Sequence, residues 1–188
     1  MRQFDVLGTV ARLAAVFERR QVWHALIGGL AVRLRARPKF DIYPSFILRV
    51  PDPALPGLLE ELAPDGFELD VVDTIRRWST DRFVAFYRGP VRVDWMQPVL
   101  PLYARVLDTA TVKPWLAGSL RVATAEGLIL TKLLAFRPQD QADIETLLAA
   151  NRDDLDLSVV RDEWAAFAAT EPERTGWFAA AVARLLPG

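Results

Sequence analysis

The chain has 188 residues, of which 52% are hydrophobic and 25% are charged, a balance typical of one globular domain or of a domain with an appendage. Its 23 lysines and arginines nearly match its 24 acidic residues, so the net charge of -1 gives no sign of a DNA-binding or membrane-binding surface. The absence of cysteine excludes disulfides, thiolate catalysis and cysteine-bound metals, and one histidine leaves little for zinc, so a metal site would need oxygen ligands that suit magnesium.

The first twenty residues lack the unbroken apolar segment and the cleavage site of a secretion signal. No later apolar run is long enough to span a bilayer. The sequence therefore predicts a cytoplasmic protein with no membrane partner.

An amphipathic helix is expected first, with Thr9 as its N-cap. Its apolar residues recur at helical spacing, at Val10, Leu13, Ala14 and Phe17. A short apolar strand should follow this helix.

That strand, Ala25 to Ile27, leads through the Gly28-Gly29 turn into an arginine-rich helix. Glycines at such a turn let a backbone approach a ligand closely, and the free N–H groups of the new helix suit an anion. This pattern predicts a phosphate site, although a tight turn without a ligand explains it equally well. His24, at the strand boundary, is expected to bond to backbone and not to act in catalysis.

The next strand is expected at Phe46 to Val50, or bulged around Pro44 near a sheet edge. Three more strands are predicted at Phe67 to Val72, Phe83 to Tyr87 and Val91 to Trp95. In the last of these, alternation places Asp94 on the opposite face from the apolar residues.

Helices dominate from Ala123 onward. Thr124 opens one helix and Pro138 starts the next, and two further amphipathic helices complete the chain. The fold class predicted is α/β (α+β), in two parts: a core over 1–122 and a helical extension over 123–188.

Three segments resemble the polymerase-beta-like nucleotidyltransferase superfamily, in particular its small bacterial branch of abortive-infection and toxin enzymes. They are LIGGLAVRLRARPKF, VRVDW and VATAEGLILTKLLAFRPQDQADIETLL, and the resemblance covers roughly residues 22 to 150. It implies a mixed sheet flanked by helices, a nucleoside triphosphate as ligand or substrate, and Mg2+ as cofactor. It also implies an RNA or protein acceptor and a toxin or antitoxin partner.

The resembled family holds two metal ions with a pair of aspartates on one strand and a third on a neighbouring strand. Asp94 matches the third position. Without a gap, however, the pair falls on Tyr43 and Ser45, and a two-residue shift puts Asp41 and Tyr43 there instead. Asp94 and Asp41 are therefore the candidate catalytic and metal-binding residues, with Ser45 as a weaker ligand.

By the same resemblance, a nucleotide would contact the diglycine turn, the C-terminal signature and the basic segment. The candidate residues are Gly28, Gly29, Lys39, Ser45, Lys132, Arg137 and Asp140. The alternative is that Lys132 is a solvated helix residue and that Asp140 and Asp143 only favour a helix N-terminus. The basic residues 33, 35, 37 and 39 would attract a triphosphate or a tRNA end, but they lack interleaved aromatics.

Three functions follow as hypotheses. The missing aspartates favour a nucleotide-binding pseudoenzyme with absent or impaired transfer. The alternatives are an active magnesium-dependent nucleotidyltransferase acting on RNA or protein, and an interaction module that uses the chain's many aromatic residues.

Overall fold

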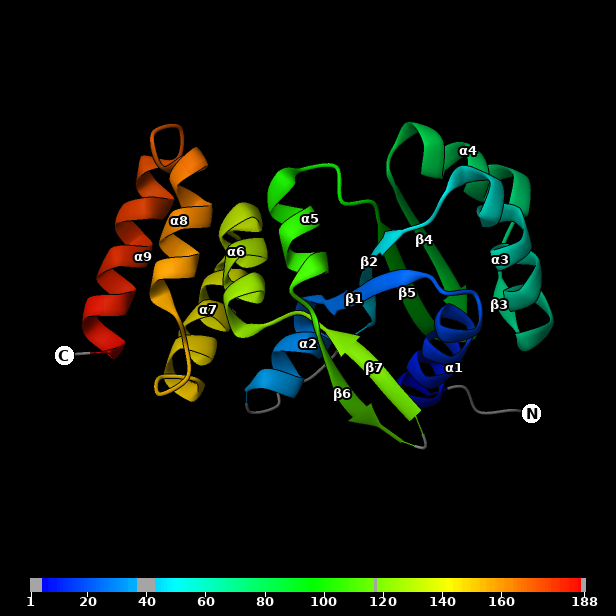
Figure 1. Cartoon of the computed structure of the whole chain (residues 1–188), viewed down its shortest axis with the longest axis horizontal. Helices are drawn as coiled ribbons and strands as arrows, with labels where there is room; N and C mark the ends of the chain where they lie inside the picture. Colours follow the sequence, from blue (N-terminus) through cyan, green and yellow to red (C-terminus); the bar gives the residue numbers. More distant parts are fainter. Residues whose placement is uncertain (1–4, 37–42, 117, 187–188) are drawn as a thin grey trace.

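A seven-stranded mixed sheet forms the middle of the computed structural model, which describes residues 5–36, 43–116 and 118–186 (Figure 1). Its strands lie in the order β3-β4-β5-β2-β1-β7-β6. β2 is parallel to β5 and β1 is parallel to β7, while the other neighbours are antiparallel. The strands are β1 (Trp23–Ile27), β2 (Ser45–Arg49), β3 (Phe67–Glu68), β4 (Phe83–Arg88), β5 (Val91–Met96), β6 (Thr111–Trp115) and β7 (Gly118–Val122).

Helices flank this sheet and make up the described chain after Ala123. They are α1 (Val6–Arg19), α2 (Gly28–Arg35), α3 (Leu55–Leu62), α4 (Val71–Thr80), α5 (Pro101–Asp108), α6 (Ala125–Ala135), α7 (Pro138–Ala150), α8 (Leu157–Ala168) and α9 (Pro172–Leu185), with short 3-10 turns at Asp52–Ala54 and Ala63–Asp65. The mixed α/β fold predicted from the sequence is confirmed. None of the described helices has the length and apolar character needed to cross a membrane.

One face of the sheet is an aromatic core. The centroid of the Trp95 ring lies 4.8 Å from that of Phe86, 5.6 Å from that of Phe17 and 6.5 Å from that of Trp78. Trp95 therefore joins β4 and β5 to α1 and α4. Because alternate strand residues point to opposite faces, this packing leaves Asp94 on the other face. Four of the six tryptophans are buried, so most of this aromatic content stabilises the core.

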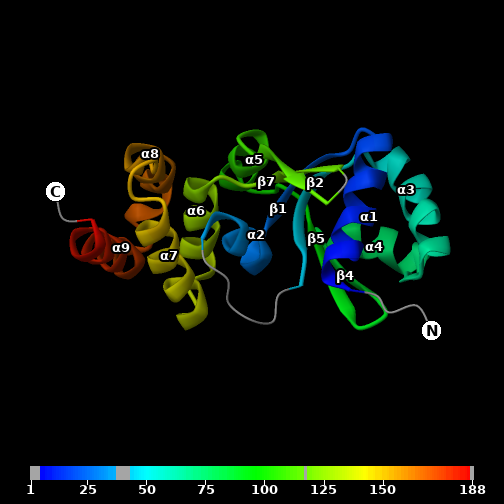
Figure 2. The same ribbon diagram turned by 90° about the horizontal axis from the view of Figure 1, so that it is seen from below.

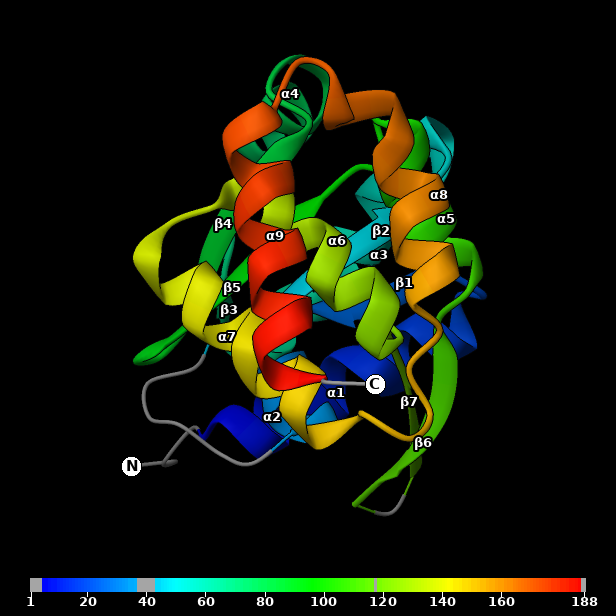
Figure 3. The ribbon, with the colours of Figure 1, turned by 90° about the vertical axis from the view of Figure 1, so that its left-hand side faces the viewer.

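The other face is covered only in part. α2 and α5 pack on β1 and β2, and both contact α6, which is almost entirely buried. α7, α8 and α9 gather around α6 at one end of the molecule, while α1, α3 and α4 lie at the other (Figures 2 and 3). α6 therefore connects the sheet to the C-terminal helices.

Two expected elements have other bounds in the structure: one begins earlier and one ends earlier. α1 starts at Val6, because Asp5 accepts the backbone N–H of Gly8 as N-cap; Thr9 lies buried inside the helix. The strand predicted over Phe67 to Val72 stops at Glu68.

Helix α4 replaces the second half of that strand. Asp70 caps α4 by accepting the Asp73 N–H at 2.9 Å, and Thr74 and Trp78 bury one helical face. A cap and an i, i+4 pair of buried side chains thus outweigh the strand preference of two adjacent valines.

Of the two alternatives for the next strand, the one at Phe46 to Val50 agrees with β2 to within one residue at each end, and the bulge around Pro44 is absent. β2 begins at Ser45 and lies in the middle of the sheet, and not near an edge. Pro44 precedes the strand and needs no N–H there, while its carbonyl accepts the N–H of Asp94 at 3.0 Å. The sequence patterns did not predict α5 or the β6-β7 hairpin.

His24 is buried in the aromatic core, as a structural residue. Its Nδ1 lies 3.0 Å from the Val22 carbonyl, which confirms the expected backbone bond, and its ring centroid is 4.9 Å from that of Phe17. Burial lowers the pKa of His24, and the nearby charge of Arg121 lowers it further, while the Val22 bond opposes both. Nδ1 must then carry the proton, and Nε2 has no hydrogen-bond partner among the described residues.

The protein should therefore lose stability as the pH falls below about 6.5, because the unfolded histidine takes up a proton that the folded one resists. In this range the protonation of His24 can add at most about 1.4 kcal/mol per pH unit to the slope of the free energy of unfolding, the limit for one proton. Denaturant unfolding between pH 5 and 7.5 measures it. The variant His24→Asn, whose amide can still donate to Val22, should lose this slope, and an unchanged slope would contradict the assignment.

Candidate functional site

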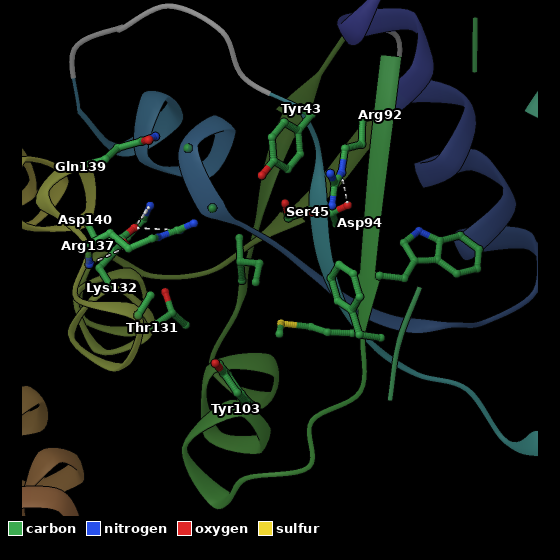
Figure 4. Close-up of a pocket in the computed structure, with 17 residues that line it drawn as sticks. Tyr43, Ser45, Arg92, Asp94, Tyr103, Thr131, Lys132, Arg137, Gln139 and Asp140 are labelled. Atoms are coloured by element: carbon green, nitrogen blue, oxygen red, sulfur yellow. Dashed lines mark hydrogen bonds and ion pairs between the residues drawn. The ribbon is translucent and has the colours of Figure 1, made fainter. Parts of the chain in front are cut away.

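A cleft of about 380 Å3 opens on the sheet face opposite the aromatic core. Residues at and before β2 and on β5 form one wall, residues from α6 and α7 form the other, and the Gly28-Gly29 turn lies between them (Figure 4). The fold thus brings together segments more than 80 residues apart in the sequence. Among the described candidates, the lining residues are Gly28, Gly29, Ser45, Asp94, Lys132, Arg137 and Asp140.

The strand wall is built by the parallel pairing of β2 with β5. Ser45 lies opposite Asp94 in this register. Tyr43, two residues earlier, also lines the cleft. Tyr43 and Ser45 therefore stand beside Asp94, where the resemblance without a gap would place the aspartate pair, and neither brings a carboxylate. Asp41 and Lys39 lie outside the described residues.

Arg92 occupies the strand wall next to Asp94, and sequence analysis did not single it out. Its Nε donates to Asp94 Oδ1 at 2.8 Å, and its guanidinium carbon lies 5.2 Å from the centroid of the Tyr43 ring. The bond to Asp94 raises the pKa of Arg92. The signal that could have found it was the alternation of β5, which puts positions 92 and 94 on one face.

The diglycine turn approaches this wall closely. Gly28 has a φ of 70°, a left-handed conformation that glycine adopts without strain. A Cβ there would lie 3.3 Å from Ser45 Oγ. No side chain caps the N-terminus of α2, whose first two residues line the cleft. The backbone N–H groups at this helix start therefore suit an anionic ligand.

The helix wall contains a buried ionic cluster. Lys132 Nζ lies 2.8 Å from Asp140 Oδ1 and 2.8 Å from Asp143 Oδ2, and all three residues are at least nine-tenths buried. The alternative of a solvated Lys132 is therefore wrong. Nζ donates one hydrogen bond to Asp140, and its contact with Asp143 is an ion pair. Because an ammonium has three N–H donors, at least one is left for a further acceptor.

Asp140 also organises the start of α7. It accepts the backbone N–H of Arg137 at 3.1 Å and the Arg137 Nε at 2.7 Å, as expected of an acid at a helix N-terminus. Burial alone would raise the pKa of Asp140, but the hydrogen bonds from Arg137 and Lys132 together outweigh it and hold the pKa below its usual value. The side chain of Arg137 stays 68% exposed at the cleft.

The described part of the basic segment does not form the cleft. Arg35 donates to the carbonyls of Ala123 and Val122, at 2.9 and 3.1 Å, and thereby ties α2 to β7. Arg33 is exposed on α2 away from the lining residues. Residues 37 and 39 are outside the described ranges.

The described donors do not fit a two-magnesium centre. Asp94 is the one carboxylate among the described residues of the strand wall, and a guanidinium is already bonded to it. A metal ion would have to displace or repel that cation. Across the described chain, no three His, Asp or Glu side chains gather closely enough to hold an ion.

Replacing Gly28 by a residue with a Cβ should strain the left-handed turn. Gly28→Ala should lower the free energy of unfolding by about 1–2 kcal/mol, because alanine resists a left-handed backbone. Gly29→Ala, at a neighbour without positive φ, is the matched control and should cost less. Urea unfolding compares the two variants, and equal losses would contradict the assigned turn geometry.

Replacing Lys132 should show how much the buried carboxylates destabilise the protein when their cation is removed. Lys132→Met should lower the free energy of unfolding by about 3–5 kcal/mol, since Asp143 loses its cation. Adding Asp143→Asn should recover part of this loss, and Lys113→Met, on the exposed side of β6, should change little. Calorimetry can compare these proteins; a Lys132→Met protein as stable as the control would rule out a strongly coupled cluster.

No protein-family model and no curated protein matches the sequence. Among solved structures, the chain is similar to an antigenic nucleotidyltransferase-like protein from Paracoccidioides brasiliensis, with a TM-score of 0.57 and 17% identity over 93% of this chain and 92% of that one. A second structure, ANT(2")-Ia in complex with adenylyl-2"-tobramycin, has a TM-score of 0.46 and 13% identity over 95% of this chain and 97% of that one. The first similarity shows that the chain has a nucleotidyltransferase-like fold.

Proposed function

We propose that the chain binds a nucleoside triphosphate in the cleft without transferring its nucleotidyl group. One observation carries this proposal. The cleft joins a glycine turn to two partly exposed arginines, Arg92 and Arg137, while its candidate metal ligand Asp94 is paired with Arg92.

Phosphate binding is supported by the donors around the cleft. The start of α2 offers backbone N–H groups, and the missing Cβ of Gly28 leaves room for a ligand near Ser45. Arg137 reaches the cleft from the opposite wall, and Lys132 has an unused donor. These hydrogen-bond donors suit a polyphosphate ligand, which has several oxygens, better than a ligand with a single carboxylate.

Loss of transfer is supported by the chemistry of the strand wall. Transfer requires metal-bound oxygens that stabilise the charge developing on the transferred and leaving phosphates. Tyr43 and Ser45 offer hydroxyl groups, which are weaker magnesium ligands than carboxylates. Neither replaces an aspartate.

The second candidate is an active magnesium-dependent nucleotidyltransferase that modifies RNA or protein. The position of Asp94 directly opposite Ser45 favours it, because one family carboxylate position is retained in the cleft. This alternative needs Asp41 as a second carboxylate.

A bacterial origin and a toxin or antitoxin partner rest on the resemblance alone, while a cytoplasmic location and the division of the chain at residue 122 rest on sequence patterns. We extend the proposal to a bacterial cytoplasmic protein with a toxin or antitoxin partner and with the two-part division at residue 122. Nucleotide binding does not depend on these extensions.

A transfer assay separates the two candidates. The protein should leave total RNA and itself unlabelled when it is incubated with α-labelled nucleoside triphosphates and magnesium, because it lacks the paired carboxylates. Label that appears with the natural chain and disappears with Asp94→Ala would establish the enzyme instead. Gel autoradiography provides the readout.

Isothermal titration should detect saturable binding of at least one of the four ribonucleoside triphosphates. Arg137→Gln should weaken it by about tenfold, the usual effect of losing one charged hydrogen bond. Arg184→Gln is the matched control, because Arg184 is also an exposed arginine paired with an acid but lies outside the cleft. Absence of binding by all four nucleotides would overturn the proposed function.

A further inference from the structure

The Arg92-Asp94 pair places a fixed cation where the resembled chemistry requires a metal ion. Both residues lie on β5 and point to the cleft, and the Asp94 side chain is only 11% exposed (Figure 4). Arg92 keeps 41% of its side chain exposed. The charge bound to the carboxylate therefore belongs to the protein and is accessible from the cleft.

We infer that Arg92 takes the place of the divalent cation, so that the cleft binds a nucleoside triphosphate in its metal-free form. This inference rests on the proposed function and specifies the form of its ligand. It also assigns a binding role to Arg92, which lies in the VRVDW segment but to which the resemblance gives no role.

The geometry of Arg92 supports such a role. A guanidinium has five N–H donors, and Nε is the one that bonds to Asp94. The other donors make no hydrogen bond within the described residues, which leaves a planar fork suited to two phosphate oxygens. Asp94 and the Tyr43 ring, 5.2 Å away, hold this fork at the strand wall.

The charges of the two walls support the same ligand. Arg137 also donates to one carboxylate, Asp140, and stays exposed. The charge of Lys132, in contrast, is balanced by two buried acids. Two arginines on opposite walls thus face the cleft, and they attract a bare triphosphate more strongly than one whose charge a magnesium ion has partly neutralised.

The alternative is that Arg92 only excludes a metal ion from the site. In that case Arg92 would contribute nothing to ligand affinity. The two roles differ in the effect of removing the guanidinium, because metal exclusion alone predicts unchanged or tighter binding.

Titration with and without metal tests the inference. The full chain is titrated with the four ribonucleoside triphosphates and with inorganic tripolyphosphate, in EDTA and in excess magnesium. Binding in EDTA should equal or exceed binding in magnesium, and it should weaken as salt is added. Arg92→Gln should weaken binding in EDTA by at least about tenfold.

Arg49→Gln provides the matched control. Arg49 lies on the neighbouring strand β2, and its side chain is 50% exposed. Its Nη1 lies 3.0 Å from Asp108 Oδ1, and neither residue lines the cleft. Its replacement should leave affinity unchanged. Circular dichroism melting of each variant verifies that the folded protein is being compared.

Three results would overturn the inference. If binding needs magnesium, the metal-free form is wrong while the proposed nucleotide binding stands. If folded Arg92→Gln binds as tightly as the natural chain in EDTA, Arg92 only excludes a metal ion. If no ligand binds under either condition, the inference falls together with the proposed function.

Discussion

Parallel pairing of β2 with β5 sets Ser45 opposite Asp94 and Phe46 opposite Trp95. Because side chains alternate across a strand, this one register sends the aromatic pair to the core and the polar pair to the cleft. A slip by one residue would bury Asp94 among aromatic rings and expose Trp95. The burial of Trp95 against Phe17 and Phe86 therefore also holds the strand wall in place.

The helix wall depends on a different kind of interaction. Lys132, Asp140 and Asp143 are charged groups withdrawn from water, and each is tolerable only because the others are present. They join α6 to α7, and α6 in turn packs on α2 and α5 beside the central strands. The two walls of the cleft are thus fixed to one another through α6, while Arg92 and Arg137 remain exposed within it.

Sequence analysis identified seven of the 17 described cleft residues (Figure 4) but not their partners. Gly28, Asp94, Lys132 and Asp140 were found because their motifs are local and combine with strand or helix periodicity. Arg92 was missed, since an arginine on a strand has no motif of its own, and its role depends on the carboxylate beside it. The strand predicted over Phe67 to Val72 was wrong beyond Glu68, because a cap by Asp70 and the packing of Trp78 outweighed local propensity.

The sequence by itself determined the α/β fold class, the glycine turn and the presence of a tyrosine and a serine at positions 43 and 45. Those features follow from periodicity, from the conformational freedom of glycine and from residue identity, all of which are local. Tertiary structure alone decided that Lys132 is buried between two acids, that Ser45 faces Asp94, and that the arginines line one cleft. Burial and pairing depend on segments that are distant in the chain. Local patterns therefore do not determine which charged side chains form ion pairs.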